Sequence, residues 1–263
     1  MATCYRHPDR ETGVSCSNCG RPICPDCMTP TPVGMRCPEC SQQKTQVRNL
    51  RSMAVDPIAT YILLGINVAI FLGASSSQNA VNEMVLWGPG VADGDYWRLL
   101  TSGFLHTSIF HLLMNGLALF WLGRMIEPAL GHARFVAIYL VSLLAGSVGV
   151  MLLSWDASTL GASGAVYGLL GAAIVMARNR NIPLMDSGLL PILALNLGIT
   201  FLIPNISIGG HLGGLVGGLL TTFVIEELSR RRRNSLPLAV GFSVAAGAVA
   251  IAASVALASN PVL

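Results

Sequence analysis

Residues 207–225 read SIGGHLGGLVGGLLTTFVI, a stretch of membrane-spanning length that contains no Lys, Arg, Asp or Glu. Gly210, Gly214 and Gly218 recur every four residues, so on a helix they share one face. Because glycine carries no side chain, such a face lets the backbone of a second helix approach closely. The stretch therefore predicts a closely packed membrane helix with one ionisable side chain, His211, inside it.

Apolar segments of similar length recur along the chain of 263 residues. They lie at about residues 58–74, 111–126, 135–154, 163–177, 187–204, 207–225 and 236–258. Only 11% of the residues are charged and the mean hydropathy is +0.61, whereas soluble domains carry about 25% charged residues. This composition excludes an ordinary soluble globular protein, and the segments predict seven membrane helices.

Two features interrupt this regular series. The joint at about residues 75–110 is long and contains Trp87, Tyr96 and Trp97. Amphipathic rings favour the membrane interface, so we expect this joint to be a loop in the interface. The fourth segment spans only about 15 residues, less than a full crossing. We expect it to begin below the outer surface, with residues 154–162 dipping into the protein.

The charges of the chain predict its orientation. A net charge of +3 is small and dispersed, so it does not favour nucleic-acid binding. The basic residues gather at every second joint, namely Lys44, Arg48 and Arg51, then Arg124 and Arg134, then Arg178 and Arg180, and finally Arg230 to Arg233. Because Lys and Arg in short loops stay on the cytoplasmic side, we expect a cytoplasmic N-terminus and an outer C-terminus. The predicted location is a bacterial plasma membrane.

All seven cysteines lie in the first 40 residues, in pairs separated by two positions. With His7 they form four pairs of metal-binding side chains: Cys4 and His7, Cys16 and Cys19, Cys24 and Cys27, and Cys37 and Cys40. Two pairs complete one tetrahedral Zn²⁺ site, so the eight ligands predict two structural zinc ions. A disulfide framework fits an odd number of cysteines poorly. So short a segment cannot bury a sufficient core, and the metal would supply its folding energy.

The segment Cys4 to Cys40 resembles the B-box type zinc finger, in which alternate pairs share a metal. The resemblance implies one site of Cys4, His7, Cys24 and Cys27 and another of Cys16, Cys19, Cys37 and Cys40. The spacing alone leaves a pairing of adjacent pairs open. No basic helix follows a C2H2 pattern, so we expect a protein partner or a purely structural role rather than DNA binding.

Polar side chains inside membrane segments are costly and point to function. Ser163 begins the fourth segment and His211 lies early in the sixth, so both fall at a similar depth. A histidine can accept the proton of a serine hydroxyl and make it a nucleophile. Gly164 and Gly168 repeat the four-residue spacing of the sixth segment, which favours the close approach that a Ser–His pair needs. Taken singly, Ser163 is also explained as a packing residue and His211 as an interhelical hydrogen-bond donor.

His111 and Asn115 share one helix face near the outer end of the second segment. Their donors could stabilise the negative oxygen of a tetrahedral intermediate. Mutual structural hydrogen bonding is the alternative. Tyr167 follows Ser163 by one turn and could orient the histidine ring, or it could simply pack as an aromatic side chain.

Four motifs together resemble the rhomboid family of intramembrane serine proteases, over about residues 58–225. They are Trp97-Arg98, His111-x3-Asn115, Gly161-x-Ser163-Gly164 with Tyr167, and Gly210-His211-x2-Gly214. Many members have alanine where this chain has Gly210, and glycine keeps a small residue there. The resemblance implies an all-α polytopic bundle with a six-helix core, to which residues 236–258 add the seventh helix of the six-plus-one members.

The resemblance also implies roles for these residues. Ser163 is the nucleophile and His211 the general base, without an acidic third member. His111 and Asn115 stabilise the oxyanion together with the N–H of the serine, and Tyr167 packs on the histidine. Trp97 and Arg98 are structurally important. The family needs no metal or cofactor for catalysis.

We therefore predict four regions: a double zinc finger at 1–42, a basic linker at 43–57, a protease core at 58–225, and a basic loop with a seventh helix at 226–263. The expected activity is cleavage of transmembrane segments of membrane proteins in the lipid bilayer, near its outer face. A non-catalytic rhomboid-like binder is disfavoured because both Ser163 and His211 are present. A transporter or channel is disfavoured because no inverted repeat is evident.

Overall fold

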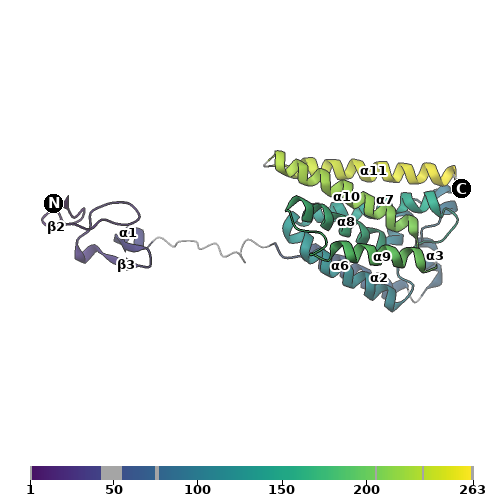
Figure 1. Ribbon diagram of the computed structural model, residues 1–263, viewed down its shortest axis with the longest axis horizontal. Coiled ribbons are helices and arrows are strands. Elements are labelled where there is room, and N and C mark those ends of the chain that lie inside the picture. Colours follow the sequence, from purple (N-terminus) through teal and green to yellow (C-terminus); the bar gives the residue numbers. More distant parts are fainter. Residues whose placement is uncertain (1, 43–54, 75–76, 205, 233, 262–263) are drawn as a thin grey trace. The chain divides into compact units, whose positions relative to one another are not determined.

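The computed structural model describes residues 2–42, 55–74, 77–204, 206–232 and 234–261 (Figure 1). The chain divides into two compact units, Met1–Ala54 and Val55–Leu263. Most of the predicted basic linker, residues 43–54, lies outside the described residues, as does Arg233. The boundary between the units falls within that linker.

Two small antiparallel pairs and two short helices form the N-terminal unit. Strand β1 (Ala2–Thr3) pairs with β2 (Glu11–Thr12), and β3 (Thr29–Thr31) pairs with β4 (Gly34–Arg36). Helices η1 (Pro25–Cys27) and α1 (Pro38–Ser41) each begin with a proline directly after a cysteine, a residue whose fixed φ suits a first helical turn. The core of this unit consists of six buried cysteines around Ile23. It contains little apolar surface besides the thiols.

One carboxylate links the two ends of the N-terminal unit. Glu39 accepts a hydrogen bond from the hydroxyl of Tyr5 and forms an ion pair with Arg6 at 2.7 Å. The hydrogen bond from Tyr5 lowers the pKa of Glu39 to about 2. These contacts join the segment after Cys4 to the helix that carries Cys40.

The helical unit contains all seven predicted helices. They are α2 (Ile58–Ala74), α6 (Ile109–Leu130), α7 (His132–Leu153), α8 (Ser163–Asn179), α9 (Leu189–Leu202), α10 (Ile208–Arg231) and α11 (Leu236–Ser259). Among the described residues, α6, α7, α10 and α11 are long and apolar enough to cross a membrane, and α2 and α9 are shorter apolar helices. The predicted all-α membrane bundle is confirmed.

The joint at 75–110 differs from the loop that the sequence suggested. It contains α3 (Gln78–Met84), α4 (Gly88–Ala92), α5 (Arg98–Thr101) and the short helix η3 (Ser102–Phe104). Helices this short satisfy only a few of their own backbone groups, so the remaining groups need partners outside the helix. Trp87, Tyr96 and Trp97 are exposed, as an interfacial position requires.

Helix α7 lies at the centre of the unit and packs against α8, α10 and α11. Helices α8 and α10 meet through the glycine faces that the sequence predicted. A Cβ atom at Gly214 would lie 2.0 Å from the carbonyl oxygen of Gly164, and one at Gly218 would lie 2.0 Å from that of Gly168. No side chain fits at these crossings, so the glycines set the separation of the two backbones.

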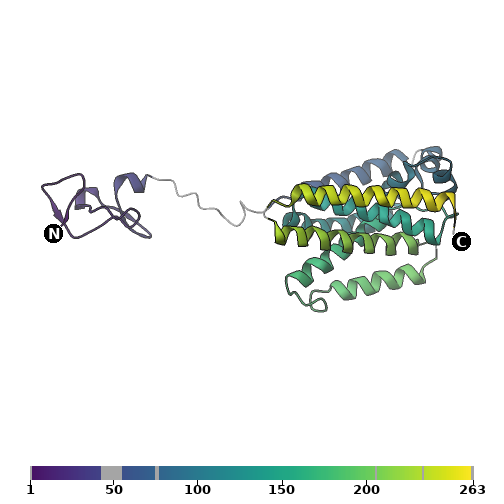
Figure 2. The same cartoon turned by 90° about the horizontal axis from the view of Figure 1, so that it is seen from above.

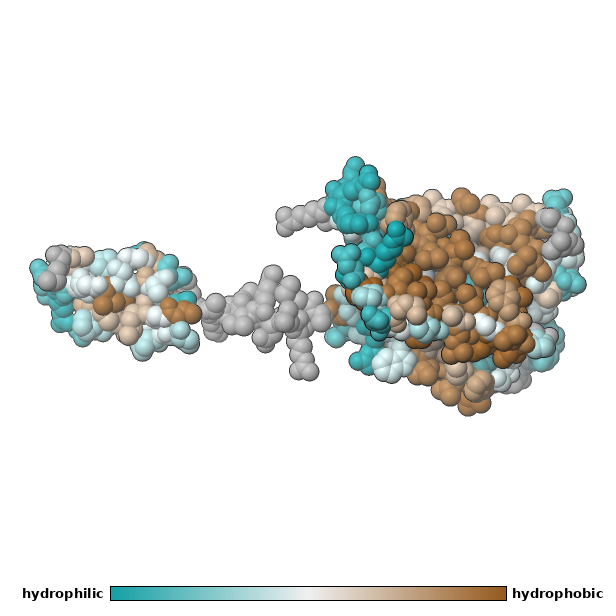
Figure 3. Space-filling view, viewed as in Figure 1, coloured by the Kyte–Doolittle hydropathy of each residue, from teal (hydrophilic) through white to brown (hydrophobic). Residues whose placement is uncertain are grey.

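Helix α9 lies at the outer edge of the helical unit (Figure 2). Only Leu189 and Thr200 of this helix are buried, and residues such as Leu195 and Leu202 are largely exposed. The face of the unit seen in Figure 3 is also largely apolar, with hydrophilic residues gathered toward its ends. Lipid is the solvent that such a surface requires.

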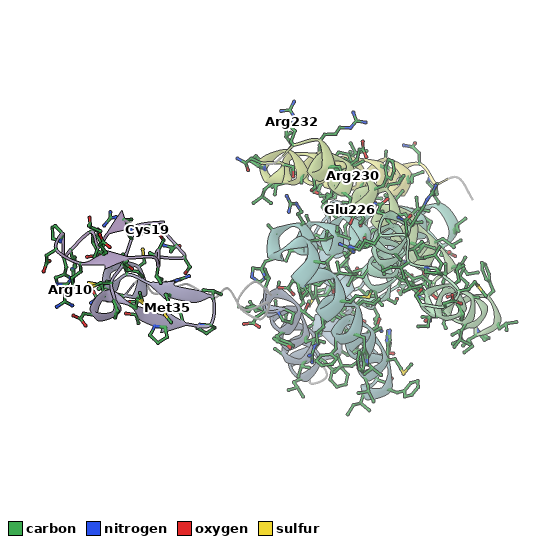
Figure 4. All side chains as sticks on the ribbon, turned by 60° about the vertical axis from the view of Figure 1, so that its left-hand side comes forward. Arg10, Cys19, Met35, Glu226, Arg230 and Arg232 are labelled. Atoms are coloured by element: carbon green, nitrogen blue, oxygen red, sulfur yellow. The ribbon has the colours of Figure 1, made fainter. Side chains whose placement is uncertain are left out.

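The end of α10 carries a cluster of charged side chains. Figure 4 labels Glu226, Arg230 and Arg232 there. Arg230 pairs with Glu227 at 2.9 Å, and Glu226 lies 3.8 Å from Arg180 after α8. Some of the basic residues that the sequence analysis assigned to the cytoplasmic side, Arg180 and Arg230 among them, are thus paired with glutamates.

Candidate active site

Ser163 and His211 lie in direct contact. Ser163 is the first residue of α8, and His211 belongs to the first turn of α10. The serine Oγ lies 2.8 Å from the histidine Nε2, although 48 residues separate the two positions. His211 is 8% exposed, so water has little access to its ring. A hydroxyl at hydrogen-bond distance from an imidazole nitrogen is the arrangement of an activated nucleophile.

The segment before Ser163 presents the serine through an unusual backbone conformation. Gly161 has a φ of +127°, which L side chains rarely adopt, and a Cβ there would lie 2.8 Å from the ring of His111. Its N–H donates to the carbonyl of Ser102 at 2.9 Å. Glycine is therefore required at position 161 for two reasons, the conformation and the closeness of His111.

One of the two predicted oxyanion residues, His111, lies beside this segment. His111 is half-buried, and its Nδ1 lies 3.3 Å from the hydroxyl of Thr107, which leaves Nε2 beside Gly161. Asn115 is 8% exposed and donates from Nδ2 to the carbonyl of His111 at 3.0 Å. An amide nitrogen has two hydrogens, so one N–H of Asn115 is left for another acceptor. The backbone N–H groups in the first turn of α8, including that of Ser163, are further donors at this site.

Tyr167 stacks on the ring of His211. The two ring centroids are 4.1 Å apart with an interplanar angle of 17°. The Tyr167 hydroxyl lies 2.6 Å from Oγ1 of Thr200, and that same Oγ1 lies 2.7 Å from Nδ1 of His211. The histidine is thus held on its face by the tyrosine and on its second nitrogen by the threonine.

Trp97 and Arg98 lie outside this constellation. Trp97 donates from Nε1 to the carbonyl of Glu83 at 3.0 Å. Arg98 is 8% exposed, pairs with Asp95 at 2.7 Å and donates to the carbonyl of Val85 at 3.0 Å. Both side chains connect α5 to the segment around α3, which supports the structural role implied by the resemblance.

Comparison with known proteins identifies the family to which this chain belongs. Residues 93–228, about half of the chain, match the Rhomboid domain family. The chain belongs to the rhomboid family. His111, Ser163 and His211 lie within the matched range.

Several curated rhomboid proteins are similar to this chain. The rhomboid protease GluP of Bacillus subtilis (strain 168) is 37% identical over 171 residues, which are 62% of this chain and 34% of GluP. The putative rhomboid protease YdcA of the same organism is 33% identical over 187 residues, 67% of this chain and 92% of YdcA. RHOMBOID-like protein 7 of Arabidopsis thaliana is 36% identical over 161 residues, 59% of this chain and 50% of that protein. The matched region is thus about a third of GluP and most of YdcA.

The N-terminal unit brings its eight candidate ligands into two groups. Cys4, His7, Cys24 and Cys27 form one group, and Cys16, Cys19, Cys37 and Cys40 form the other. The ligand atoms within each group all lie within 4.8 Å of one another. Cys19 is the exposed member of its group (Figure 4). The grouping is that of alternate pairs, and each group could bind a metal ion.

Two polar residues that the sequence analysis did not single out are important here. Thr200 contacts both Tyr167 and His211, as described above. Glu127 of α6 is fully buried and accepts hydrogen bonds from the backbone N–H groups of Ala59 and Thr60, at 2.8 and 2.7 Å. Both residues lie within or beside apolar segments, where the cost of a polar group could have revealed them.

Proposed function

We propose that this rhomboid is an intramembrane serine endopeptidase that cleaves transmembrane segments of membrane proteins near the outer face of the bilayer. The observation that carries the proposal is the 2.8 Å contact between Ser163 Oγ and His211 Nε2 inside a bundle of membrane helices. Membership of the rhomboid family supports the same reaction class. A non-catalytic rhomboid would have no need for an activated serine at this depth.

The proposed reaction uses four side chains, those of Ser163, His211, His111 and Asn115. Ser163 attacks the scissile carbonyl carbon while His211 Nε2 takes the hydroxyl proton. The N–H of Ser163, the ring of His111 and the free N–H of Asn115 donate to the oxyanion. His211 then returns the proton to the leaving amine, and the acyl group stays on Ser163. A water molecule then attacks the ester while His211 takes one of its protons. His211 returns this proton to Ser163 Oγ as the carboxylic acid product leaves.

The membrane restricts the substrates of such an enzyme. The carbonyls of an intact transmembrane helix are hydrogen-bonded within the helix, so the helix must unwind locally before Ser163 can attack. Glycine and proline weaken a helix by about 1 and 3 kcal/mol relative to alanine. The preferred substrates are therefore transmembrane segments with such residues near the outer boundary.

We also propose that the N-terminal unit holds two structural zinc ions. A tetrahedron with Zn–S of about 2.3 Å and Zn–N of about 2.0 Å has ligand–ligand edges of about 3.5 to 3.8 Å. Cys24 Sγ and Cys27 Sγ lie 3.4 and 3.5 Å from His7 Nδ1, and Cys19 Sγ lies 3.8 Å from Cys37 Sγ. The donor set fits zinc, which when bound would stabilise the fold of this unit. Such a unit would bind a protein partner or serve a purely structural role.

A cleavage assay with matched variants tests the protease function. The purified protein is reconstituted in lipid with a model transmembrane substrate, and wild type is compared with Ser163→Ala, His211→Ala and the control Ser158→Ala. Ser158 is an exposed serine of the same segment. We expect cleavage and fluorophosphonate labelling of wild type and the control alone. Equal cleavage by all four proteins would reject the Ser–His pair, whereas a folded wild type that neither cleaves nor reacts would favour the non-catalytic binder.

A further inference from the structure

Thr200 is the buried residue at the outer end of α9. The other residues in the last turn of this helix, such as Ile199 and Phe201, are 39% and 58% exposed, whereas Thr200 is 2% exposed. Its hydroxyl is the point at which α9 contacts the catalytic histidine. The side chain is therefore inserted into the site, although the helix around it faces outward.

The hydrogen bonds of Thr200 can be assigned by counting donors and acceptors. Its Oγ1 lies 2.8 Å from the carbonyl oxygen of Asn196, 2.6 Å from the Tyr167 hydroxyl and 2.7 Å from His211 Nδ1. A hydroxyl offers one hydrogen and two lone pairs. A carbonyl oxygen can only accept, so the hydrogen of Thr200 goes to Asn196. The two lone pairs then accept the O–H of Tyr167 and the N–H of His211 Nδ1.

This assignment decides which nitrogen of His211 carries the proton. If Nδ1 donates to Thr200, then Nε2 of the neutral ring has a free lone pair, and this is the nitrogen that faces Ser163. The opposite tautomer would carry a hydrogen on Nε2 and could not accept the proton of the serine. A hydrogen bond at one ring nitrogen is a recognised way of fixing the chemistry of the other.

We propose that Thr200 is a positioning residue that holds His211 in its base-competent tautomer, in the place that an acidic residue takes in a serine protease triad. The proposal rests on the proposed protease function, because it assigns a role within that reaction. Thr200 touches neither the substrate nor the attacking oxygen and acts through the histidine alone. Three side chains from three helices then form one hydrogen-bonded series, from Ser163 of α8 to His211 of α10 and Thr200 of α9.

The test compares Thr200→Val with Thr200→Ser and with a matched control. Valine has the shape of threonine without the hydroxyl, and serine keeps the hydroxyl. Thr222→Val is the control, because Thr222 is also fully buried and its hydroxyl has no hydrogen-bond partner among the described residues. We expect Thr200→Val to lower kcat roughly tenfold with little change in KM, since one neutral hydrogen bond and the tautomer preference are lost. Thr200→Ser and Thr222→Val should retain most of the wild-type kcat.

A second measurement reads the tautomer directly. Nitrogen-15 spectra of histidine-labelled protein distinguish a protonated Nδ1 from a protonated Nε2. We expect the Nδ1–H form for His211 in wild type and its loss in Thr200→Val, in samples with matched thermal unfolding. Wild-type kcat in Thr200→Val, beside an inactive Ser163→Ala, would overturn the role of Thr200 and leave the protease function standing. If the wild type does not cleave, the protease function fails, and an Nε2–H form in its spectrum would overturn the assignment as well.

Discussion

The substitution Gly214→Ala should separate α8 from α10 and break the contact between Ser163 and His211. A Cβ at position 214 would lie 2.0 Å from the carbonyl oxygen of Gly164, whereas ordinary contacts begin at about 3.4 Å. The helices must therefore move apart by about 1 Å or more at this crossing. Gly164 follows Ser163 directly and Gly214 lies one turn after His211, so the 2.8 Å distance between the serine and the histidine would lengthen by a similar amount.

The expected result is a large loss of activity with a moderate loss of stability. A displacement of about 1 Å in a catalytic pair costs on the order of 100-fold in rate, and overpacking a well-packed interface costs about 1 to 3 kcal/mol. Steady-state cleavage of a transmembrane substrate measures the first quantity, and thermal unfolding in detergent measures the second. Gly241→Ala in α11 is the control, because a Cβ there meets nothing within 4 Å. Wild-type cleavage by Gly214→Ala would refute the reasoning that the glycine crossing sets the geometry of the site.

Three further substitutions or treatments test other parts of the molecule. Trp155→Phe removes the 2.9 Å hydrogen bond from Nε1 to the carbonyl of Ala258, which ties the segment before the nucleophile to α11. We expect its initial cleavage rate to fall by roughly threefold to tenfold, the effect of one lost hydrogen bond, and an unchanged rate would contradict a role for α11 in the site. Glu127→Gln removes a buried charge that accepts hydrogen bonds from the N-terminus of α2 and from the hydroxyl of Thr60 at 2.6 Å. It should lower the free energy of unfolding by about 2 kcal/mol. Glu227→Gln, which removes the partly exposed ion pair with Arg230 at the end of α10, should lower it by much less, because such ion pairs contribute little. Metal analysis should find two zinc ions in each chain, and a chelator should make the N-terminal unit sensitive to protease while cleavage of the model substrate continues. A folded N-terminal unit without metal would rule out the zinc assignment.

Local patterns predicted most of the helices. The predicted limits 58–74 agree with α2, and the predicted limits 236–258 agree with α11 to within one residue. The joint at 75–110 was misjudged because α3, α4 and α5 have only four to seven residues each. Helices of that length leave no apolar periodicity to detect, since they span only about one to two turns.

The sequence by itself determined the membrane class, the seven long helices and the identity of the chemical groups, because these depend on hydropathy, glycine spacing and residue type along the chain. Ser163, His211, His111 and Asn115 are polar residues in apolar segments, and such residues are conspicuous in any membrane sequence. The tertiary structure alone decided which of these groups meet and through which atoms. In the sequence, Thr200 is one of several hydroxyl-bearing residues in the apolar segments, and nothing local distinguishes it. Only the packing of α9 beside α10 brings its Oγ1 to Nδ1 of His211. The physical reason is that a hydrogen bond requires two atoms to lie within about 3 Å, and residues 11 or 48 positions apart meet at that distance only when the helices between them are packed.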